Sequence, residues 1–292
     1  MTWLAHPAEI RTLAYMGLVT VVAIAHWSIG FFSPWLLIVS LSLSLAVSVM
    51  HHNHSHRPIW RRRGLNLVTD VWFTLFQGHP GYVFETMHID NHHRFHNGSD
   101  DVTRTDRFRP GNDLPGLLRH PFEFAFAASP NIAARVFASF RDDPRDFAWI
   151  VAHYAILIGV DALALWVDWK AAIYVVLSPQ IAAMFWLLAS NYLQHAHTCG
   201  DSTFDHSRNF LGLVNPLVFN VGYHTAHHHA PDLHWTELPK AHRAIAPRIS
   251  PALNEPSFAW YMFRVFFLAL IFRRFRSQPL KPQLHMDSDR EQ

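Results

Sequence analysis

Two pairs of long apolar segments constrain the fold of this chain most strongly. The members of each pair are separated by a turn of only two or three residues. A helix rises about 1.5 Å per residue, so about 20 residues cross the roughly 30 Å hydrocarbon layer of a membrane. The pattern therefore predicts an all-α integral membrane protein with four transmembrane helices in two hairpins. The four segments are residues 12–32, 35–50, 147–167 and 171–193.

The composition agrees with a membrane location. Half of the 292 residues are hydrophobic and 16% are charged, which is a small share of charge for a soluble protein. A soluble bundle of buried helices is the alternative, but soluble helices seldom stay apolar on all sides for this length. The formal net charge of +2 gives no reason to expect a nucleic-acid partner. The single cysteine, Cys199, excludes an internal disulfide and thiolate-held metal clusters.

Charged residues predict how the chain is oriented. Four arginines follow the second segment, whereas the turn at Ser33 and Pro34 carries no charge. By the positive-inside rule, we expect a multi-pass protein of the cell inner membrane with both termini and the histidine clusters in the cytoplasm. The second segment reaches a membrane-spanning length only if its helix continues beyond Met50. The arginines are Arg57, Arg61, Arg62 and Arg63.

The rest of the chain is predicted to form a helical cap on the cytoplasmic side. Residues 117–140 combine apolar positions with two arginines and are interpreted as an interfacial helix. Residues 258–276 are interpreted as a helix in the membrane plane rather than a crossing. Residues 277–292 are polar and are predicted to be a disordered tail. This divides the chain into a folded domain, residues 1–276, and that tail.

Histidines are the main candidates for chemistry. Nine of the 23 histidines lie between His51 and His96, and eight lie between His195 and His234. Histidine is costly to bury in a membrane protein and is the commonest metal ligand. This clustering therefore indicates one metal site made from two distant segments.

Four short motifs place these side chains at helical spacing, so that members of a motif share a face. The motifs are "HNHSH" from residue 52, "HIDNHH" from 88, "NYLQH" from 191 and "HTAHH" from 224. Nine imidazoles are too many for one tetrahedral zinc and suit two metals with four or five ligands each, so a dinuclear iron site is the economical interpretation. The candidate residues are His52, His56, His88, His92, His93, Asn191, His195, His224, His227 and His228.

These motifs resemble the three histidine boxes of the membrane fatty acid desaturase and hydroxylase superfamily, in which HxxxH is followed by HxxHH or HxxxHH and then by HxxHH. "NYLQH" is similar to the family's intermediate segment, and "HHHAPDLHWTELP" to the stretch after the last box. The resemblance covers about residues 35–240. It implies that the nine histidines bind two irons and that Asn191 holds an iron-bound water. The chain departs from the pattern in its spare histidines, which are His51, His54, His96, His197 and His229.

The resemblance also implies a reaction. It is the oxygen-dependent oxidation of a fatty acyl chain in the membrane by two irons, with dioxygen as co-substrate and desaturation as the expected outcome. A fatty acid or acyl carrier would be the substrate, and a separate donor of ferredoxin, rubredoxin or cytochrome type, with its reductase, would supply electrons. The histidines would hold and tune the metal, so no catalytic residue separate from the ligands is expected.

Three alternatives remain at this point. The same iron core in the superfamily also supports hydroxylation and the oxidative decarboxylation of a free fatty acid to a terminal alkene. The arginines beside the first box keep decarboxylation open, since they would hold a substrate carboxylate, although a topology signal explains them as well. A membrane metal transporter or sensor is the non-enzyme alternative, which is disfavoured because the histidines stand at helix ends rather than along the spans.

Several other motifs have plainer interpretations. "GHPGY" at 78–82 is interpreted as a turn rather than the haem-binding loop of a fused cytochrome. The acidic run Asp100, Asp101 and Asp106 is interpreted as a solvated loop rather than as carboxylate ligands. Asp161 lies in the third apolar segment and is by default a functional candidate, but a place near the far membrane face explains it too. No HExxH sequence occurs, which removes the commonest zinc-protease interpretation.

Overall fold

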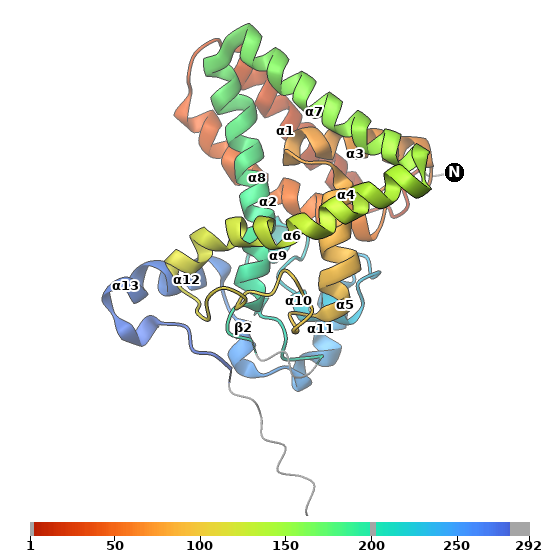
Figure 1. Ribbon diagram of the computed structural model, residues 1–292. Coiled ribbons are helices and arrows are strands. Elements are labelled where there is room, and N and C mark those ends of the chain that lie inside the picture. Colours follow the sequence, from red (N-terminus) through yellow and green to blue (C-terminus); the bar gives the residue numbers. More distant parts are fainter. Residues whose placement is uncertain (1–2, 199–202, 281–292) are drawn as a thin grey trace, which may run out of the picture.

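Helices make up most of the protein (Figure 1). The computed structural model describes residues 3–198 and 203–280. Within them, the strands β1 (Asn209–Phe210) and β2 (Asn254–Glu255) form one parallel pair, so the prediction of an all-α chain is confirmed apart from this pair. Cys199 and residues 281–292, which include most of the predicted tail, lie outside the described residues.

Six helices of 15 or more residues fix the architecture of the described part of the chain. They are α1 (Glu9–Ser28), α2 (Pro34–His56), α3 (Arg63–Gln77), α6 (Leu114–Asp142), α7 (Pro144–Ala171) and α8 (Ser178–His195). The shorter α-helices are α4 (Gly81–Phe84), α5 (His93–Phe95), α9 (Val214–Leu217), α10 (His224–His229), α11 (Leu238–Ile245), α12 (Phe258–Phe263) and α13 (Ala269–Ile271). The π-helical segments are η1 (Glu85–His92), η2 (Ala172–Leu177) and η5 (Arg264–Leu268), and the 3₁₀ turns are η3 (Ala246–Arg248), η4 (Pro251–Leu253) and η6 (Arg273–Phe275).

The first predicted hairpin is present as α1 and α2. Ser33 is the N-cap of α2, and its hydroxyl accepts the Leu36 N–H at 3.4 Å. Pro34 occupies the first turn, where an N–H would have no partner within the helix. The helix does not end with the apolar run at Met50 but continues to His56. This continuation carries the first histidines out of the apolar region on a rigid element.

The second predicted hairpin is one helical stretch, Pro144–His195, which contains α7, η2 and α8. At Asp168 the backbone leaves helical geometry (φ −152°, ψ 95°) and the chain reverses direction (Figure 1). The Asp168 carboxylate accepts the N–H groups of Lys170 and Ala171 at 3.0 Å each, as an N-cap does. The predicted turn at 168–170 is therefore confirmed.

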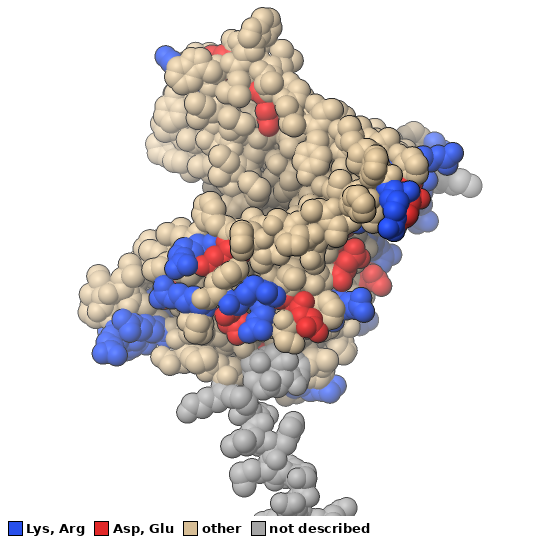
Figure 2. Space-filling view, viewed as in Figure 1, with Lys and Arg blue, Asp and Glu red and all other residues tan. Residues whose placement is uncertain are grey.

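The helices of these hairpins have the features of a membrane protein. Within the described residues, three stretches are long and apolar enough to cross a bilayer, and the third of them holds both the third and the fourth predicted segments. Figure 2 shows that the half of the visible face built by α1, α7 and α8 is almost free of charged residues, which gather on the other half. Trp35 on α2 and Trp166 on α7 are 77% and 83% exposed, as expected for lipid-facing side chains. The three stretches are Glu9–Ser28, Pro34–His56 and Pro144–His195.

Serines inside α2 explain how the two hairpins pack. Ser44 Oγ donates to Pro179 O at 3.0 Å, and one turn later Ser48 Oγ donates to Ala183 O at 2.6 Å. Small polar side chains of this kind let membrane helices approach closely and form hydrogen bonds across the interface. Helices α2 and α8 therefore run side by side toward the histidines.

The predicted interfacial helix is present as α6, which is longer than expected. Pro130 lies inside it and has no N–H for the carbonyl of Phe126, so the Ser129 hydroxyl donates to that carbonyl instead at 2.8 Å. The helix continues to Asp142. The predicted in-plane helix corresponds to Phe258–Ile271, which is shorter than a membrane span.

Two buried hydrophobic clusters connect the apolar helices to the part of the protein that carries most of the charged residues. The larger contains Met50 and Phe73 from α2 and α3 together with Phe219 and Trp235 from the C-terminal part of the chain. The smaller is built around Tyr192 on α8 and also contains side chains of α12 and η5. Both clusters therefore join the histidine-bearing helices to segments that follow later in the sequence.

Candidate metal centre

Along one face of α2, two serines are followed by two histidines at the point where the helix leaves the apolar region. Ser44, Ser48, His52 and His56 are each four residues apart and so share that face. Because the serines hold this face against α8, the two histidines project into the space beyond them. Their ring centroids lie 5.0 Å apart.

The second box lies in a π-helix, η1, rather than in an α-helix. The wider turns of a π-helix bring residues five apart onto one face. His88 and His93 meet there, with their Nε2 atoms 3.1 Å apart. His92 points the other way, and its Nε2 lies 3.1 Å from that of His195 on α8. The prediction that His88 and His92 act as an i, i+4 pair is therefore wrong. The π-helix brings His88 to His93, whereas His92 approaches His195.

The short helix α10 divides the last box in a similar way. His224 and His228 are four residues apart, and their Nε2 atoms lie 3.0 Å apart. His227 faces the opposite side, where its Nε2 lies 2.9 Å from that of His52 and 3.1 Å from that of His93. Histidines that are far apart in the sequence, His52, His93 and His227, thus lie in contact with one another.

Nine histidines from four segments form two groups. In each group the ligand atoms of four histidines lie within 4.8 Å of one another, and His93 joins the first group through its contacts with His88 and His227. A cavity of about 40 Å³ is lined by histidines of both groups. The first group contains His52, His56, His88, His93 and His227, and the second contains His92, His195, His224 and His228.

The nitrogen positions fit metal coordination. Two imidazole nitrogens that bind one ion at about 2.1 Å, about 90° apart, lie about 3.0 Å from each other. The Nε2 pairs within the two groups are separated by 2.9 to 3.1 Å. His56 Nε2 is buried and has no hydrogen-bond partner among the described residues. Each group thus offers four or five imidazole nitrogens, a donor set that suits iron and other first-row transition metals.

Burial favours the neutral form of four of these imidazoles. It lowers the pKa of His88 well below the usual value, and neighbouring histidines lower that pKa further. The same two causes lower the pKa values of His224, His227 and His228. A neutral imidazole has a free lone pair, so no proton has to leave before a metal binds.

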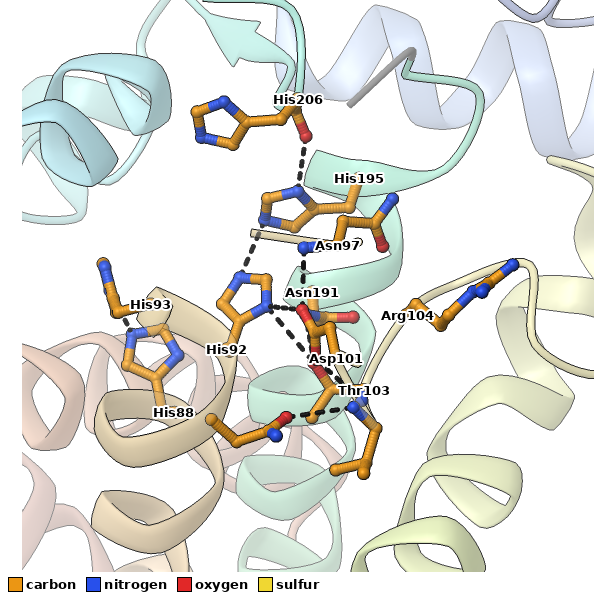
Figure 3. A network of polar contacts seen from close by, with 12 residues as sticks. His88, His92, His93, Asn97, Asp101, Thr103, Arg104, Asn191, His195 and His206 are labelled. Atoms are coloured by element: carbon orange, nitrogen blue, oxygen red, sulfur yellow. Dashed lines mark hydrogen bonds and ion pairs between the residues drawn. The ribbon is translucent and has the colours of Figure 1, made fainter. Parts of the chain in front are cut away.

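A buried carboxylate orients His92 (Figure 3). Asp101 Oδ2 lies 2.7 Å from His92 Nδ1, while Asp101 Oδ1 accepts the hydroxyl of Thr103 at 2.6 Å and its N–H at 2.8 Å. Burial alone would raise the pKa of the Asp101 carboxyl, but its contacts with His92 and Thr103 bring that pKa below its usual value. A carboxylate on the outer nitrogen of a metal ligand fixes the tautomer and the ring orientation of that ligand.

The interpretation of Asp100, Asp101 and Asp106 as part of a solvated loop is wrong for Asp101, which is fully buried. His96 and Asn97 both have left-handed backbone conformations (φ 47° and 62°), which turn the chain back toward η1. The Asn97 N–H then donates to Asp101 Oδ2 at 2.8 Å. Asp106, by contrast, is 51% exposed and pairs with Arg104. The spacing of residues along the chain does not predict this turn.

The two candidate residues on α8 are held by groups that lie outside the motifs. His195 Nδ1 donates to the backbone carbonyl of His206 at 2.7 Å, which leaves the lone pair on Nε2, toward the second group. The side-chain amide of Asn191 lies 3.1 Å from His120 Nε2 and 3.4 Å from Thr103 Oγ1. Sequence analysis missed His120 and His206 because each is a single residue that only the tertiary fold brings here.

The spare histidines lie mostly apart from the two groups. His96 is the exception, because its ligand atom lies within 4.8 Å of those of His93 and His228. The other four have different surroundings, namely Phe73 for His51, Asp70 for His54, Ser277 for His197 and the surface for His229.

An apolar cavity of about 150 Å³ leads to the histidines. It is lined by α4, η1, α6 and α8, and most of its lining side chains are apolar. His88 of the first group and His92 of the second lie in its wall, together with Asn191. His79, from the predicted turn at 78–82, lines it as well, which the sequence did not suggest. A cavity of this kind suits a hydrocarbon chain rather than an ion or a polar metabolite.

Two other candidates from the sequence, the arginines beside the first box and Asp161, lie outside the lining of the apolar cavity. Arg57 donates to the backbone carbonyl of Asp232, and Arg61 to carbonyls of the N-terminal segment. No lysine or arginine of the described residues lines the cavity. Asp161 accepts from Gln180 Nε2 at 3.0 Å, a contact that joins α7 to α8.

Comparisons with known proteins agree with this arrangement. A family profile described as fatty acid desaturase matches residues 25–261, which include both histidine groups and the cavity. The sphingolipid delta(4)-desaturase of Candida albicans (strain SC5314 / ATCC MYA-2876) is 36% identical to this chain over 58 residues. That alignment covers 18% of this chain and 16% of the relative, so it spans only a small part of either protein. The chain belongs to the fatty acid desaturase family, a family of oxidoreductase enzymes.

Proposed function

We propose that this protein catalyses the oxygen-dependent oxidation of a fatty acyl chain in the membrane, with desaturation to a C=C bond as the reaction. One observation carries the proposal. The wall of the apolar cavity contains one histidine from each group, His88 and His92. An acyl chain in this cavity would therefore have a C–H bond beside both groups. The family match and the desaturase relative support the same class of reaction.

Two iron ions, one in each histidine group, would supply the oxidising power, with dioxygen and two electrons, that an unactivated C–H bond requires. The residues of the chain do the positioning. Asp101 and the carbonyl of His206 fix the rings of His92 and His195. Asn191, itself held by His120, would hold a water at the edge of the site. The apolar wall keeps bulk water away from the reacting carbon.

Electrons would come from a separate donor of ferredoxin, rubredoxin or cytochrome type with its reductase. Four members of the first group, His52, His56, His88 and His93, are only partly buried, whereas the second group is fully buried. We therefore expect electrons to enter through the first group. The donor would dock on the cytoplasmic side of the cell inner membrane, which the histidines face if the chain crosses four times with both termini inside.

Desaturation is preferred to oxidative decarboxylation on the basis of charge. Decarboxylation of a free fatty acid needs the carboxylate close to the metals, and a buried carboxylate is held most strongly by a cationic partner. No lysine or arginine of the described chain lines the cavity. Arg57 and Arg61, two of the arginines that kept this alternative open, contact other segments instead.

Product analysis tests the proposal. Cells that express the protein are fed a deuterated medium-chain fatty acid, and the extracted lipid and the headspace gas are analysed by mass spectrometry. We expect an internally unsaturated acid with an unchanged number of carbons. A volatile alkene one carbon shorter, or a hydroxylated acid, would replace desaturation with that reaction. The absence of any oxygen-dependent product from an iron-loaded protein would overturn the enzyme proposal.

Neighbouring histidines on α10 provide a matched control. His228 is buried in the second group, whereas His229 is exposed at the next position. His228→Ala is expected to lower the iron content and to abolish product formation. His229→Ala is expected to keep both at the wild-type level. If the two variants behaved alike, the histidine group would not be the reactive site.

A further inference from the structure

The apolar cavity meets a second apolar space at α6. This space is an open groove of about 560 Å³ between α6 and α7, and it has no charged residue in its lining. Ile132 lines both the cavity and the groove. Its side chain therefore lies between the cavity beside the histidines and the groove on the surface of the protein.

Helix α6 supplies one wall of both spaces. Ala125, Ala128 and Ile132 follow one another at helical spacing and line the cavity, whereas Ala133 and its neighbours line the groove. The small side chains along this wall leave room beside the helix. From Ala125 to Phe140, which is the last groove residue on α6, the route follows the helix axis for about 22 Å.

The mouth of the groove opens beside a membrane-spanning helix. Phe147 and Tyr154, which line it, lie in the first turns of the apolar stretch that begins at Pro144. Phe137 and Phe140 on the facing helix are 64% and 61% exposed. Exposed aromatic side chains in an uncharged lining fit the acyl region of a membrane better than water.

The polar atoms of the groove are satisfied within the protein. The hydroxyls of Tyr82 and Tyr154 lie 2.9 Å apart and bond to each other. The Ser129 hydroxyl donates to the carbonyl of Phe126, inside α6. Each of these three groups therefore has a hydrogen-bond partner within the protein, which lowers the cost of placing a hydrocarbon chain beside them.

We propose that the groove between α6 and α7 is a lateral entrance, through which the acyl chain of a bilayer lipid passes Ile132 and reaches the cavity beside His88 and His92. The identity of the occupant rests on the proposed function. Because Ile132 lines both spaces, an acyl chain is favoured over a second copy of this protein or another protein partner, since only a narrow chain can pass this side chain from the groove into the cavity.

Photolabelling tests the route without turnover. The full-length protein is placed in vesicles of phosphatidylethanolamine and phosphatidylglycerol that contain a fatty acid with a photoreactive diazirine on its chain. After illumination, we expect cross-links in residues 124–140 and 147–154 that an excess of unlabelled fatty acid suppresses. Cross-links that are spread evenly over the apolar helices, with no excess in these segments, would overturn the proposal. Labelling at these segments in a protein that forms no product would contradict the proposed reaction but not the route.

Two neighbouring alanines give a matched pair of variants. Ala133 lines the groove, whereas Ala134 is exposed and lines neither space. Ala133→Trp is expected to lower cross-linking at residues 124–128 by about fivefold or more, which corresponds to about 1 kcal/mol, with the iron content unchanged. Ala134→Trp should match the wild type. Equal cross-linking in the two variants would show that acyl chains reach the cavity by another way.

Discussion

His88 and His93 are five residues apart, and their Nε2 atoms lie 3.1 Å from each other because the backbone from Glu85 to His92 is π-helical. His92 faces the opposite group and approaches His195 instead. Two histidines that are adjacent in the sequence therefore belong to different groups.

Substitution of these neighbours should remove different ions. His93→Ala removes a nitrogen from the first group and His92→Ala one from the second, so each is expected to lower the iron content from about two ions per chain to about one. Metal analysis gives the content, and Mössbauer spectroscopy shows which environment is lost. If the two variants lost the same spectral component, the division into two groups would be wrong.

Asp101→Asn should weaken the second group selectively. The amide keeps the size of the side chain but not the charge that holds His92 Nδ1 at 2.7 Å. Loss of such an outer partner typically lowers metal affinity by about 10- to 100-fold. Chelator competition should therefore extract one of the two irons more readily. Asp100→Asn is the control, because Asp100 is exposed. Faster loss of iron from both variants would argue against a specific role for Asp101.

Ala128→Phe should shorten the acyl chains that the enzyme accepts. Ala128 is buried and lines the cavity, so a larger side chain fills space that the substrate would occupy. The added volume is expected to cost about 1 to 3 kcal/mol of stability. Competition between fatty acids of different length, followed by mass spectrometry, measures the shift. The control is Ala138→Phe at an exposed position of the same helix. An unchanged product distribution with Ala128→Phe would place the substrate elsewhere.

Asp168→Ala should destabilise the reversal between α7 and α8. It removes the carboxylate that accepts two backbone N–H groups, which is worth about 0.5 to 2 kcal/mol for an N-cap. The expected result is a lower Tm in detergent. Asp168→Asn should restore most of the stability, because asparagine caps helices about as well as aspartate does. Equal Tm values for the alanine variant and the wild type would mean that the turn is held by packing alone.

The sequence predicted the hairpins well because their signals are local. Ser33 and Pro34 begin a helix by capping chemistry, and Asp168 ends one apolar run and caps the next. Nine histidines at helical spacing also predicted a metal site. These features depend on neighbours within a few residues, which a single sequence displays.

The division of the histidines could not be predicted in the same way. A π-helix leaves no distinct period in a sequence as short as "ETMHIDNH", so His88 and His92 read as an α-helical pair. Asp101 reads as one of several acidic loop residues, and only the left-handed turn at His96 and Asn97 brings it inside. The position of His120 depends on how α6 crosses α8, which is a property of tertiary packing.

The meeting of His52 with His227 also has a consequence for biosynthesis. These residues are separated by 175 positions, so the ribosome has made both hairpins before the first group can close. A chain whose synthesis stops early, or whose second hairpin fails to insert, presents only separated sets of imidazoles to iron. If the groups hold iron as proposed, tight iron loading is reserved for chains that have finished folding, and the metal content of a preparation reports the fraction of molecules that were assembled correctly.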